Sequence, residues 1–304
     1  MSENVQEALI KYIESLLEKG IRELHIDWFG GEPLLYPNII IELSDKINEI
    51  CCKKNVLITY SLTTNGFLLS RQIATKLMQQ GVSTIKITLD GNEEIHDSRR
   101  KLRSGIGTFN TILENINMIR DLSLAIIVRV NIDKSNRESY ADVLNVLADF
   151  EGVTVYPAVV TFEEIQDKSQ KSRCYSHKEY DDYYRNIQNI GSFYRLDTEL
   201  NRGVCSCMAE HKYSFVIDPD GYIYKCVNDI GHEKSAIGSV VDDEYRGVSA
   251  VAKYLGRDPF SENECKNCPY IPLCYGGCFS EYIDKGTHAC PPIKYLFEDV
   301  CCKG

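Results

Sequence analysis

Five short apolar segments alternate with longer amphipathic segments over the first 160 residues of this 304-residue chain. The short segments have the length of β-strands, and the longer ones repeat their apolar residues at the spacing of a helix. The expected strands are 23–29, 56–63, 84–90, 125–131 and 153–160, and the expected helices are 5–17, 38–52, 70–80, 108–121 and 138–149. Strands joined by helices form a parallel sheet, which right-handed connections curl into a full or partial barrel.

Four of these strands alternate polar and apolar side chains, although a parallel strand that is covered on both faces normally reads as continuous Val, Ile and Leu. The polar positions are His25, Asp27, Thr59, Ser61, Thr63, Asn65, Lys86, Thr88, Asp90, Arg129 and Asn131. Because the apolar side can pack against helices, the polar side predicts a concave interior that binds a polar ligand near the carboxyl ends of the strands. An exposed antiparallel face is the alternative, and the helix-length connections disfavour it.

Glycine-containing motifs follow the first three expected strands. They are GGEP at 30–33, TTNG at 63–66, and LDG at 89–91 with HDSRR at 96–100. In the first motif the glycines let a ligand approach the backbone, Glu32 offers a carboxylate to a cation such as an ammonium group, and Pro33 fixes the exit of the turn. Taken alone, GGEP is equally well a strand-to-helix turn with a solvated glutamate.

Ten of the thirteen cysteines lie between Cys205 and the C-terminus. A short secreted chain would use such thiols in disulfides, but this chain is long, carries no secretion signal and has CxxC-type spacings, which favour metal binding. The eight cysteines of the framework are Cys205, Cys207, Cys226, Cys265, Cys268, Cys274, Cys278 and Cys290. A β-hairpin expected around 213–224 returns the chain toward the first thiols. Eight thiolates can hold two four-iron clusters, and a closed zinc site is the alternative.

These motifs, with Gly107-Thr108-Phe109 after them, resemble the S-adenosylmethionine (SAM) radical enzymes, in particular the subgroup with a C-terminal SPASM domain. The cysteine part of the resemblance is Cys207-x13-Gly221-x4-Cys226, then Cx2Cx5Cx3C and a final cysteine. The resemblance implies an α/β fold, a partial (βα)6-type barrel that is N-terminally truncated, followed by a small cysteine-rich α+β SPASM domain with a β-hairpin. The expected divisions are 1–160 for the barrel, 161–203 for a linker and 204–304 for the auxiliary iron–sulfur domain.

The same resemblance assigns the cofactor sites. It implies that SAM binds with its methionine amino group at Gly30, Gly31, Glu32 and Pro33, its carboxylate region at Thr88 and Arg100, and its adenosine end near Asn131. It places Cys226 and Cys278, with Cys205 and Cys207, at a first auxiliary four-iron cluster. It places Cys265, Cys268, Cys274 and Cys290 at a second.

One motif of the family does not occur in this sequence. SAM radical enzymes hold the cluster that cleaves SAM in a Cx3Cx2C loop, and no such spacing is present. Three explanations are open: the chain is a truncated enzyme, a decayed relative, or a protein that lacks this cluster. The whole cysteine loop is missing while the downstream motifs are intact, and this favours truncation. Truncation predicts an in-frame cysteine loop in the DNA upstream of Met1, and a stop codon immediately upstream would count against it.

The implied activity is modification of a peptide or protein by 5'-deoxyadenosyl radical chemistry, with reducing flavodoxin or ferredoxin as electron donor. The chain as given is expected to be inactive. Relatives that mature sulfatases carry an aspartate directly after the cysteine that matches Cys226, and Val227 at this place disfavours that substrate. The alternative is a non-catalytic zinc or iron–sulfur module that binds a peptide or transfers electrons.

The charge and hydropathy of the chain limit the classes of partner that it can bind. A net charge of -10, with no basic stripe, disfavours nucleic-acid binding. No apolar run is long enough to cross a bilayer, and the first residues lack the features of a signal peptide, so a cytoplasmic location without membrane contact is expected.

Overall fold

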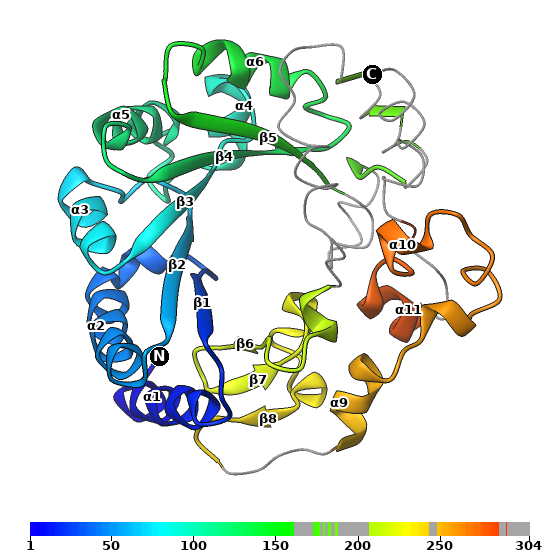
Figure 1. The fold of residues 1–304 in the computed structure, drawn as a ribbon. Coiled ribbons are helices and arrows are strands. Elements are labelled where there is room, and N and C mark those ends of the chain that lie inside the picture. The colour runs from blue at the N-terminus through cyan, green and yellow to red at the C-terminus, as the bar shows by residue number, and fades with distance from the viewer. Residues whose placement is uncertain are drawn as a thin grey trace. The chain divides into compact units, whose positions relative to one another are not determined.

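The structure is a computed structural model that describes residues 1–160, 173–176, 179, 182–183, 186–187, 207–242, 248–285 and 290. These residues form two compact units, which are described one at a time (Figure 1). One unit contains Leu17–Tyr175, and the other contains Met1–Leu16 together with the described residues from Ser176 onward. The domain limits expected from the sequence stay a prediction.

The unit that contains Leu17–Tyr175 is built on one parallel sheet with the strand order β1-β2-β3-β4-β5. Its strands are β1 (Glu23–Trp28), β2 (Leu57–Thr64), β3 (Val82–Thr88), β4 (Ala125–Ile132) and β5 (Val153–Val159). Its helices are the short 3-10 turn η1 (Pro33–Leu35), α2 (Pro37–Lys54), α3 (Arg71–Gln79), α4 (Glu93–Arg99), α5 (Phe109–Ile119) and α6 (Ser139–Val146). Helices α2, α3, α5 and α6 lie along one side of the curved sheet (Figure 1). The parallel α/β architecture expected from the sequence is confirmed, and the partial barrel is compatible with it.

The alternation along the strands divides the sheet into an apolar face and a polar face. In the apolar set, Ile85, Ile87 and Val128 are fully buried. The strand register aligns His25 with Thr59, Asp27 with Ser61, and Thr88 with Arg129, so polar residues of neighbouring strands stand side by side. Burial of each large apolar side chain contributes about 1.5–3 kcal/mol, and helix packing therefore fixes which face remains polar.

Helix α4 was not expected from the sequence, and it carries most of the HDSRR motif. Asn92 caps its first turn by accepting a hydrogen bond from the backbone of Ile95 at 3.1 Å. The N-terminus of the next helix, α5, is capped by a residue that is distant in sequence. The Asp97 carboxylate accepts from the backbone N–H groups of Thr108 at 2.8 Å and Phe109 at 2.9 Å. A Cβ at Gly107 would lie 1.9 Å from the same carboxylate, so only glycine allows this approach.

Replacement of Asp97 with alanine should lower the free energy of unfolding by about 1–2 kcal/mol, because two backbone donors at the start of α5 lose their acceptor. Chemical denaturation followed by circular dichroism measures this difference. Glu94→Ala, at an exposed position of α4, is the matched control and should change the stability by less than about 0.5 kcal/mol. Equal losses in the two variants would contradict the cap.

The second unit combines the first helix of the chain with the cysteine-rich region. Its elements are α1 (Glu3–Leu17), η5 (Met208–Glu210), β6 (Val216–Ile217), β7 (Tyr222–Tyr224), η6 (Val227–Asp229), η7 (Glu233–Ser235), β8 (Gly238–Ser239), α9 (Val248–Leu255), η8 (Pro259–Ser261), α10 (Ile271–Cys274) and α11 (Phe279–Lys285). The rings of Tyr12 and Phe215 are 6.0 Å apart in an edge-on arrangement, so α1 lies against the residues that lead into β6.

Strands β6, β7 and β8 form a small antiparallel sheet, and the first two make the hairpin expected from the sequence. Its turn is organised by Asp218, whose Oδ1 accepts from the backbone N–H groups of Asp220 and Tyr222. Gly221 follows with a φ of +91°, a conformation that side chains disfavour. The hairpin places Cys226 two residues beyond the end of β7. None of the helices in the described part of the chain has the length and hydropathy of a membrane span.

Candidate functional site

The GGEP loop leaves the carboxyl end of β1 with two glycines in the left-handed region. Gly30 has a φ of +97° and Gly31 a φ of +51°, and no atom lies within 4 Å of a Cβ built on either residue. Backbone conformation, and not crowding, therefore requires glycine here. The open space beside both residues leaves this stretch of backbone accessible to a ligand.

Glu32 fastens this loop to the end of the neighbouring strand. Its Oε1 accepts hydrogen bonds from the backbone N–H of Leu34 at 2.9 Å and from the Thr64 hydroxyl at 2.6 Å. Its Oε2 accepts from the backbone N–H of Asn65 at 2.7 Å. A carboxylate has about four acceptor positions, so three internal bonds leave room for about one more donor. Pro33 follows as the first residue of η1, where its fixed φ suits the start of the turn.

The next group lies at the end of β3, where Thr88 is half-buried and Asp90 is buried. Arg100 donates its Nε–H to Oδ2 of Asp90 at 2.6 Å. The other carboxylate oxygen of Asp90, Oδ1, is buried and has no hydrogen-bond partner in the described structure. Among the described residues this contact occupies only one nitrogen of the guanidinium, so its two terminal nitrogens can donate to a ligand.

His96 is fully buried beneath the same loop, in the neutral form with the proton on Nε2. Its Nδ1 accepts from the backbone N–H of Asp90 at 3.2 Å, and its Nε2 lies 3.1 Å from the Thr108 hydroxyl. That hydroxyl donates its own proton to the carbonyl of Arg100 at 2.6 Å, so it must accept from Nε2. Burial lowers the pKa of His96, with smaller opposing effects from Asp90 and Asp97. The ring is a structural support for the loop that contains Asp90.

Asn131, at the end of β4, is tied into the framework on two sides. Its side-chain oxygen accepts from Nε of Arg129 at 2.8 Å, and its carbonyl accepts from Nδ2 of the buried Asn136 at 2.8 Å. Asn136 also donates to the carbonyl of Asp90 at 2.7 Å, which joins the ends of β3 and β4. Arg99 contacts Asp133 at 2.9 Å and holds the loop that contains Asn136.

The predicted cofactor residues therefore occupy the carboxyl ends of β1, β3 and β4, along one edge of the sheet. The structure joins Glu32 to Thr64 and Asn65, Arg100 to Asp90, and Asn131 to Arg129 and Asn136. No hydrogen bond within the described residues links the Glu32 group to Arg100 or Asn131. Sequence reasoning missed the roles of Thr64 and Asn136, and their only signal was a polar residue beside a strand end.

The polar face below this edge carries a continuous hydrogen-bonded row. Lys86 contacts Oδ2 of Asp27 at 3.2 Å, and the Ser61 hydroxyl donates to Oδ1 of the same carboxylate at 2.7 Å. His25 lies 3.2 Å from the Ser61 hydroxyl and 2.8 Å from that of Thr59. The row confirms the expectation that polar side chains of adjacent strands would share one face.

The cysteines of the second unit fall into two neighbourhoods. The pKa of Cys226 is raised to about 11, mainly by burial, with smaller contributions from Asp229 and from the nearby thiols of Cys207 and Cys278. Burial also raises the pKa of Cys265, with added effects from the neighbouring Glu262, Cys274 and Cys290 and an opposing one from Arg257. Cys268 donates its backbone N–H to the carbonyl of Cys265 at 2.8 Å. Cys205 lies outside the described residues.

Within the described residues, no three of the potential ligands are close enough to hold a single metal ion. Four thiolates around one zinc ion lie about 3.8 Å from one another, because each sulfur is about 2.3 Å from the metal. A four-iron cluster binds each thiolate to a different iron and accepts wider spacing.

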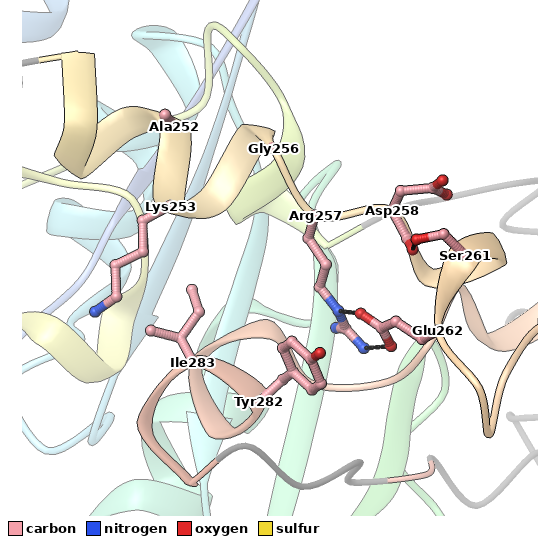
Figure 2. Close-up of a pocket in the computed structure, with 9 residues that line it drawn as sticks. All are labelled: Ala252, Lys253, Gly256, Arg257, Asp258, Ser261, Glu262, Tyr282 and Ile283. Atoms are coloured by element: carbon pink, nitrogen blue, oxygen red, sulfur yellow. Dashed lines mark hydrogen bonds and ion pairs between the residues drawn. The ribbon is translucent and has the colours of Figure 1, made fainter.

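A cavity of about 500 Å³ lies beside the second of these neighbourhoods (Figure 2). Arg257 forms its inner wall and makes two hydrogen bonds to the Glu262 carboxylate, at 2.8 and 3.1 Å. Its guanidinium lies 4.2 Å from the centre of the Tyr282 ring, and Lys253 projects from α9 at the other side of the cavity. The charge of the inner wall is thus neutralised by an ion pair.

The comparisons with known proteins agree with this geometry. Residues 2–149 match the protein family described as the Radical SAM superfamily. These residues belong to that superfamily.

The similarity to curated relatives extends through the cysteine-rich region. A cysteine-type anaerobic sulfatase-maturating enzyme of Clostridium novyi is 24% identical over 306 residues, which cover 88% of this chain and 78% of the relative. The radical SAM cyclopropyl synthase TigE of Paramaledivibacter caminithermalis is 27% identical over 324 residues, which cover 95% of this chain and 64% of the relative. The chain resembles radical SAM enzymes that modify peptides and proteins.

Solved structures share its fold. The structure described as native anSMEcpe with bound AdoMet and Kp18Cys peptide superimposes with a TM-score of 0.71 at 20% identity, covering 99% of this chain and 90% of that one. SuiB of Streptococcus suis bound to S-adenosylmethionine gives a TM-score of 0.61 at 14% identity, covering 94% of this chain and 68% of that one.

The radical SAM family uses a four-iron cluster together with SAM, and the described residues of this chain do not fit that cluster. Within 1–160 the only cysteines are Cys51 and Cys52, which are adjacent residues of α2. Cys51 is buried and Cys52 is exposed, so they do not face a common site. The three thiolates that such a cluster requires are not supplied by these residues.

His96 generates a prediction for the pH dependence of stability. Its pKa in the folded chain lies below the ordinary value of 6.5, so on acidification the unfolded chain takes up a proton before the folded chain does. The stabilisation is complete above about pH 6.5 and is lost as the pH falls toward the folded pKa.

Urea denaturation from pH 7.5 to 5 should therefore show a steeper loss of stability in the native sequence than in His96→Gln. Carbon-13 NMR provides a second measurement, because the titration midpoint of the His96 ring should lie below the ordinary value of 6.5. A midpoint at or above that value would contradict the assigned hydrogen bonds.

Proposed function

We propose that this chain is a radical SAM/SPASM-type protein that resembles enzymes modifying peptides or proteins, that it is inactive as given, and that its barrel edge binds SAM. The observation that carries the proposal is the GGEP loop at the end of β1. Two glycines leave its backbone open, and Glu32 holds it rigidly against the end of β2. A rigid, open loop at the carboxyl edge of a parallel sheet is a suitable place for a polar ligand.

Each end of SAM would meet groups of suitable chemistry along this edge. The methionine ammonium would lie at Gly30, Gly31, Glu32 and Pro33, where backbone carbonyls and the remaining acceptor position of Glu32 are available. Its carboxylate would lie near Thr88 and Arg100, since the terminal guanidinium nitrogens can bind a carboxylate. Asn131 would face the adenosine end.

We also propose that the eight framework cysteines hold two auxiliary four-iron clusters. Support comes from the two neighbourhoods, one containing Cys207, Cys226 and Cys278 and the other Cys265, Cys274 and Cys290. Cys205 and Cys268 would complete the sets. A non-catalytic zinc module is the alternative function.

A peptide or protein substrate is proposed from the relatives. One structural neighbour is described with a Kp18Cys peptide and another, SuiB, with the precursor peptide SuiA. Sulfatase-maturating relatives remain the less suitable guide to the substrate, because Val227 has no carboxylate to act as a base beside Cys226. Reducing flavodoxin or ferredoxin is proposed as the electron donor, and a cytoplasmic location follows from that reducing chemistry.

Glu32→Ala should weaken SAM binding by about tenfold or more, since the loop loses three charge-assisted hydrogen bonds and the site loses an acceptor for the ammonium. Isothermal titration with SAM under anaerobic conditions measures the affinity. Glu42→Ala, an exposed glutamate on α2, is the control and should bind as the unchanged chain does. An unchanged affinity in Glu32→Ala would remove this loop from the site.

Metal analysis tests the cysteine region separately. After anaerobic purification and cluster reconstitution, the chain should contain about eight irons with matching sulfide. Cys265→Ala should reduce this content to about four, because only the second cluster loses a ligand. Zinc without sulfide would establish the non-catalytic alternative.

A further inference from the structure

Residues of the LDG, HDSRR and Gly107-Thr108-Phe109 motifs form a closed ring of hydrogen bonds at the end of β3. The backbone N–H of Asp90 donates to Nδ1 of His96 at 3.2 Å, and Nε2 of His96 donates to the Thr108 hydroxyl at 3.1 Å. That hydroxyl donates to the carbonyl of Arg100 at 2.6 Å. The ring closes where Nε of Arg100 donates to the Asp90 carboxylate at 2.6 Å.

The ring is buried except at Arg100. His96, Asp90 and Thr108 are 0%, 5% and 7% exposed, whereas the Arg100 side chain is 38% exposed. Hydrogen bonds that are shielded from water are stronger than exposed ones, so the buried members form a rigid support. This support ends in the accessible guanidinium, whose two terminal nitrogens can donate to a planar anion.

The backbone of Arg100 is held as firmly as its side chain. Its N–H donates to the carbonyl of His96 at 2.8 Å, and its carbonyl accepts from Thr108. An arginine side chain loses much conformational entropy when it is fixed in one geometry. Because the ring fixes Arg100 before a ligand binds, that loss does not reduce the affinity for the ligand.

Thr108 can act on a ligand only through Arg100. Asp97 fixes its backbone by accepting from its N–H at 2.8 Å, and its hydroxyl contacts His96 and Arg100 inside the chain. The side chain is buried, so it does not face the open edge of the sheet. A substitution at this position therefore tests the placement of the guanidinium without changing its charge.

We propose that Thr108 and His96 are positioning residues that, with Asp90, hold the Arg100 guanidinium in the geometry that selects a ligand with a carboxylate. The proposal rests on the SAM site proposed above. A guanidinium held through Nε presents its two terminal nitrogens as a pair, which matches the two oxygens of a carboxylate. Decarboxylated SAM keeps the adenosine, sulfonium and amino groups but lacks this anion, so its binding gains nothing from the ring.

The test is isothermal titration of the full chain with SAM and, separately, with decarboxylated SAM. Thr108→Val removes the hydroxyl and keeps the shape of the side chain, and Thr108→Ser keeps the hydroxyl. Thr111→Val is the matched control. It makes the same change on α5, at a half-buried residue whose hydroxyl makes no hydrogen bond within the residues that the structure describes.

The unchanged chain should bind SAM about tenfold or more tightly than decarboxylated SAM. Thr108→Val should reduce this ratio by about fivefold, whereas Thr108→Ser and Thr111→Val should keep it. A general loss of stability weakens both ligands alike and leaves the ratio unchanged. Equal affinities in the unchanged chain, or a ratio that survives Thr108→Val, would overturn the proposal. If the unchanged chain binds neither ligand, the SAM site itself is rejected.

Nitrogen-15 NMR of the unchanged chain gives a second test that does not depend on the folding of a variant. The Nε–H of Arg100, identified by the loss of its signal in Arg100→Lys, should exchange slowly with water in the free chain because Asp90 holds it. The signal should shift with SAM and shift less with decarboxylated SAM. Rapid exchange in the free chain would show that the guanidinium is not held, and would overturn the proposal.

Discussion

Alternation of side chains along the parallel strands is the constraint on which the N-terminal site depends. Apolar residues such as Ile85, Ile87 and Val128 must pack against the helices, and this requirement fixes the orientation of every other residue in their strands. The polar row from His25 to Lys86 follows from it, and so does the alignment of the strand ends that carry Glu32, Asp90 and Asn131. A shift of one residue in the strand register would turn the polar row toward the helices and destroy the site.

The loops above this sheet are held by side chains that bind one another rather than a ligand. His96 supports the backbone of Asp90, Arg99 holds Asp133, and Asn136 joins the ends of β3 and β4. The HDSRR motif is therefore mainly a framework for the edge of the sheet. Preorganisation of this kind reduces the cost of ordering the site when a ligand binds.

Much of the fold could be predicted from the sequence, since four of the five strands of the sheet carry a regular alternation bounded by turn residues. Helix α4 could not, because six of its seven residues are polar and its stability comes from the burial of His96 and from contacts distant in the chain. Glu32 could be selected as a site residue, but its partners Thr64 and Asn65 depend on the pairing of two strand ends.

The contact between Asp97 and Gly107 restricts the order in which this chain can change during evolution. A side chain at position 107 would occupy the space of the Asp97 carboxylate, whereas a shorter residue at position 97 costs only a helix cap. Position 97 must therefore change before position 107 can. Homologues that have passed through this pair of changes should contain a small residue at 97 wherever they lack glycine at 107, so the two alignment columns would vary together.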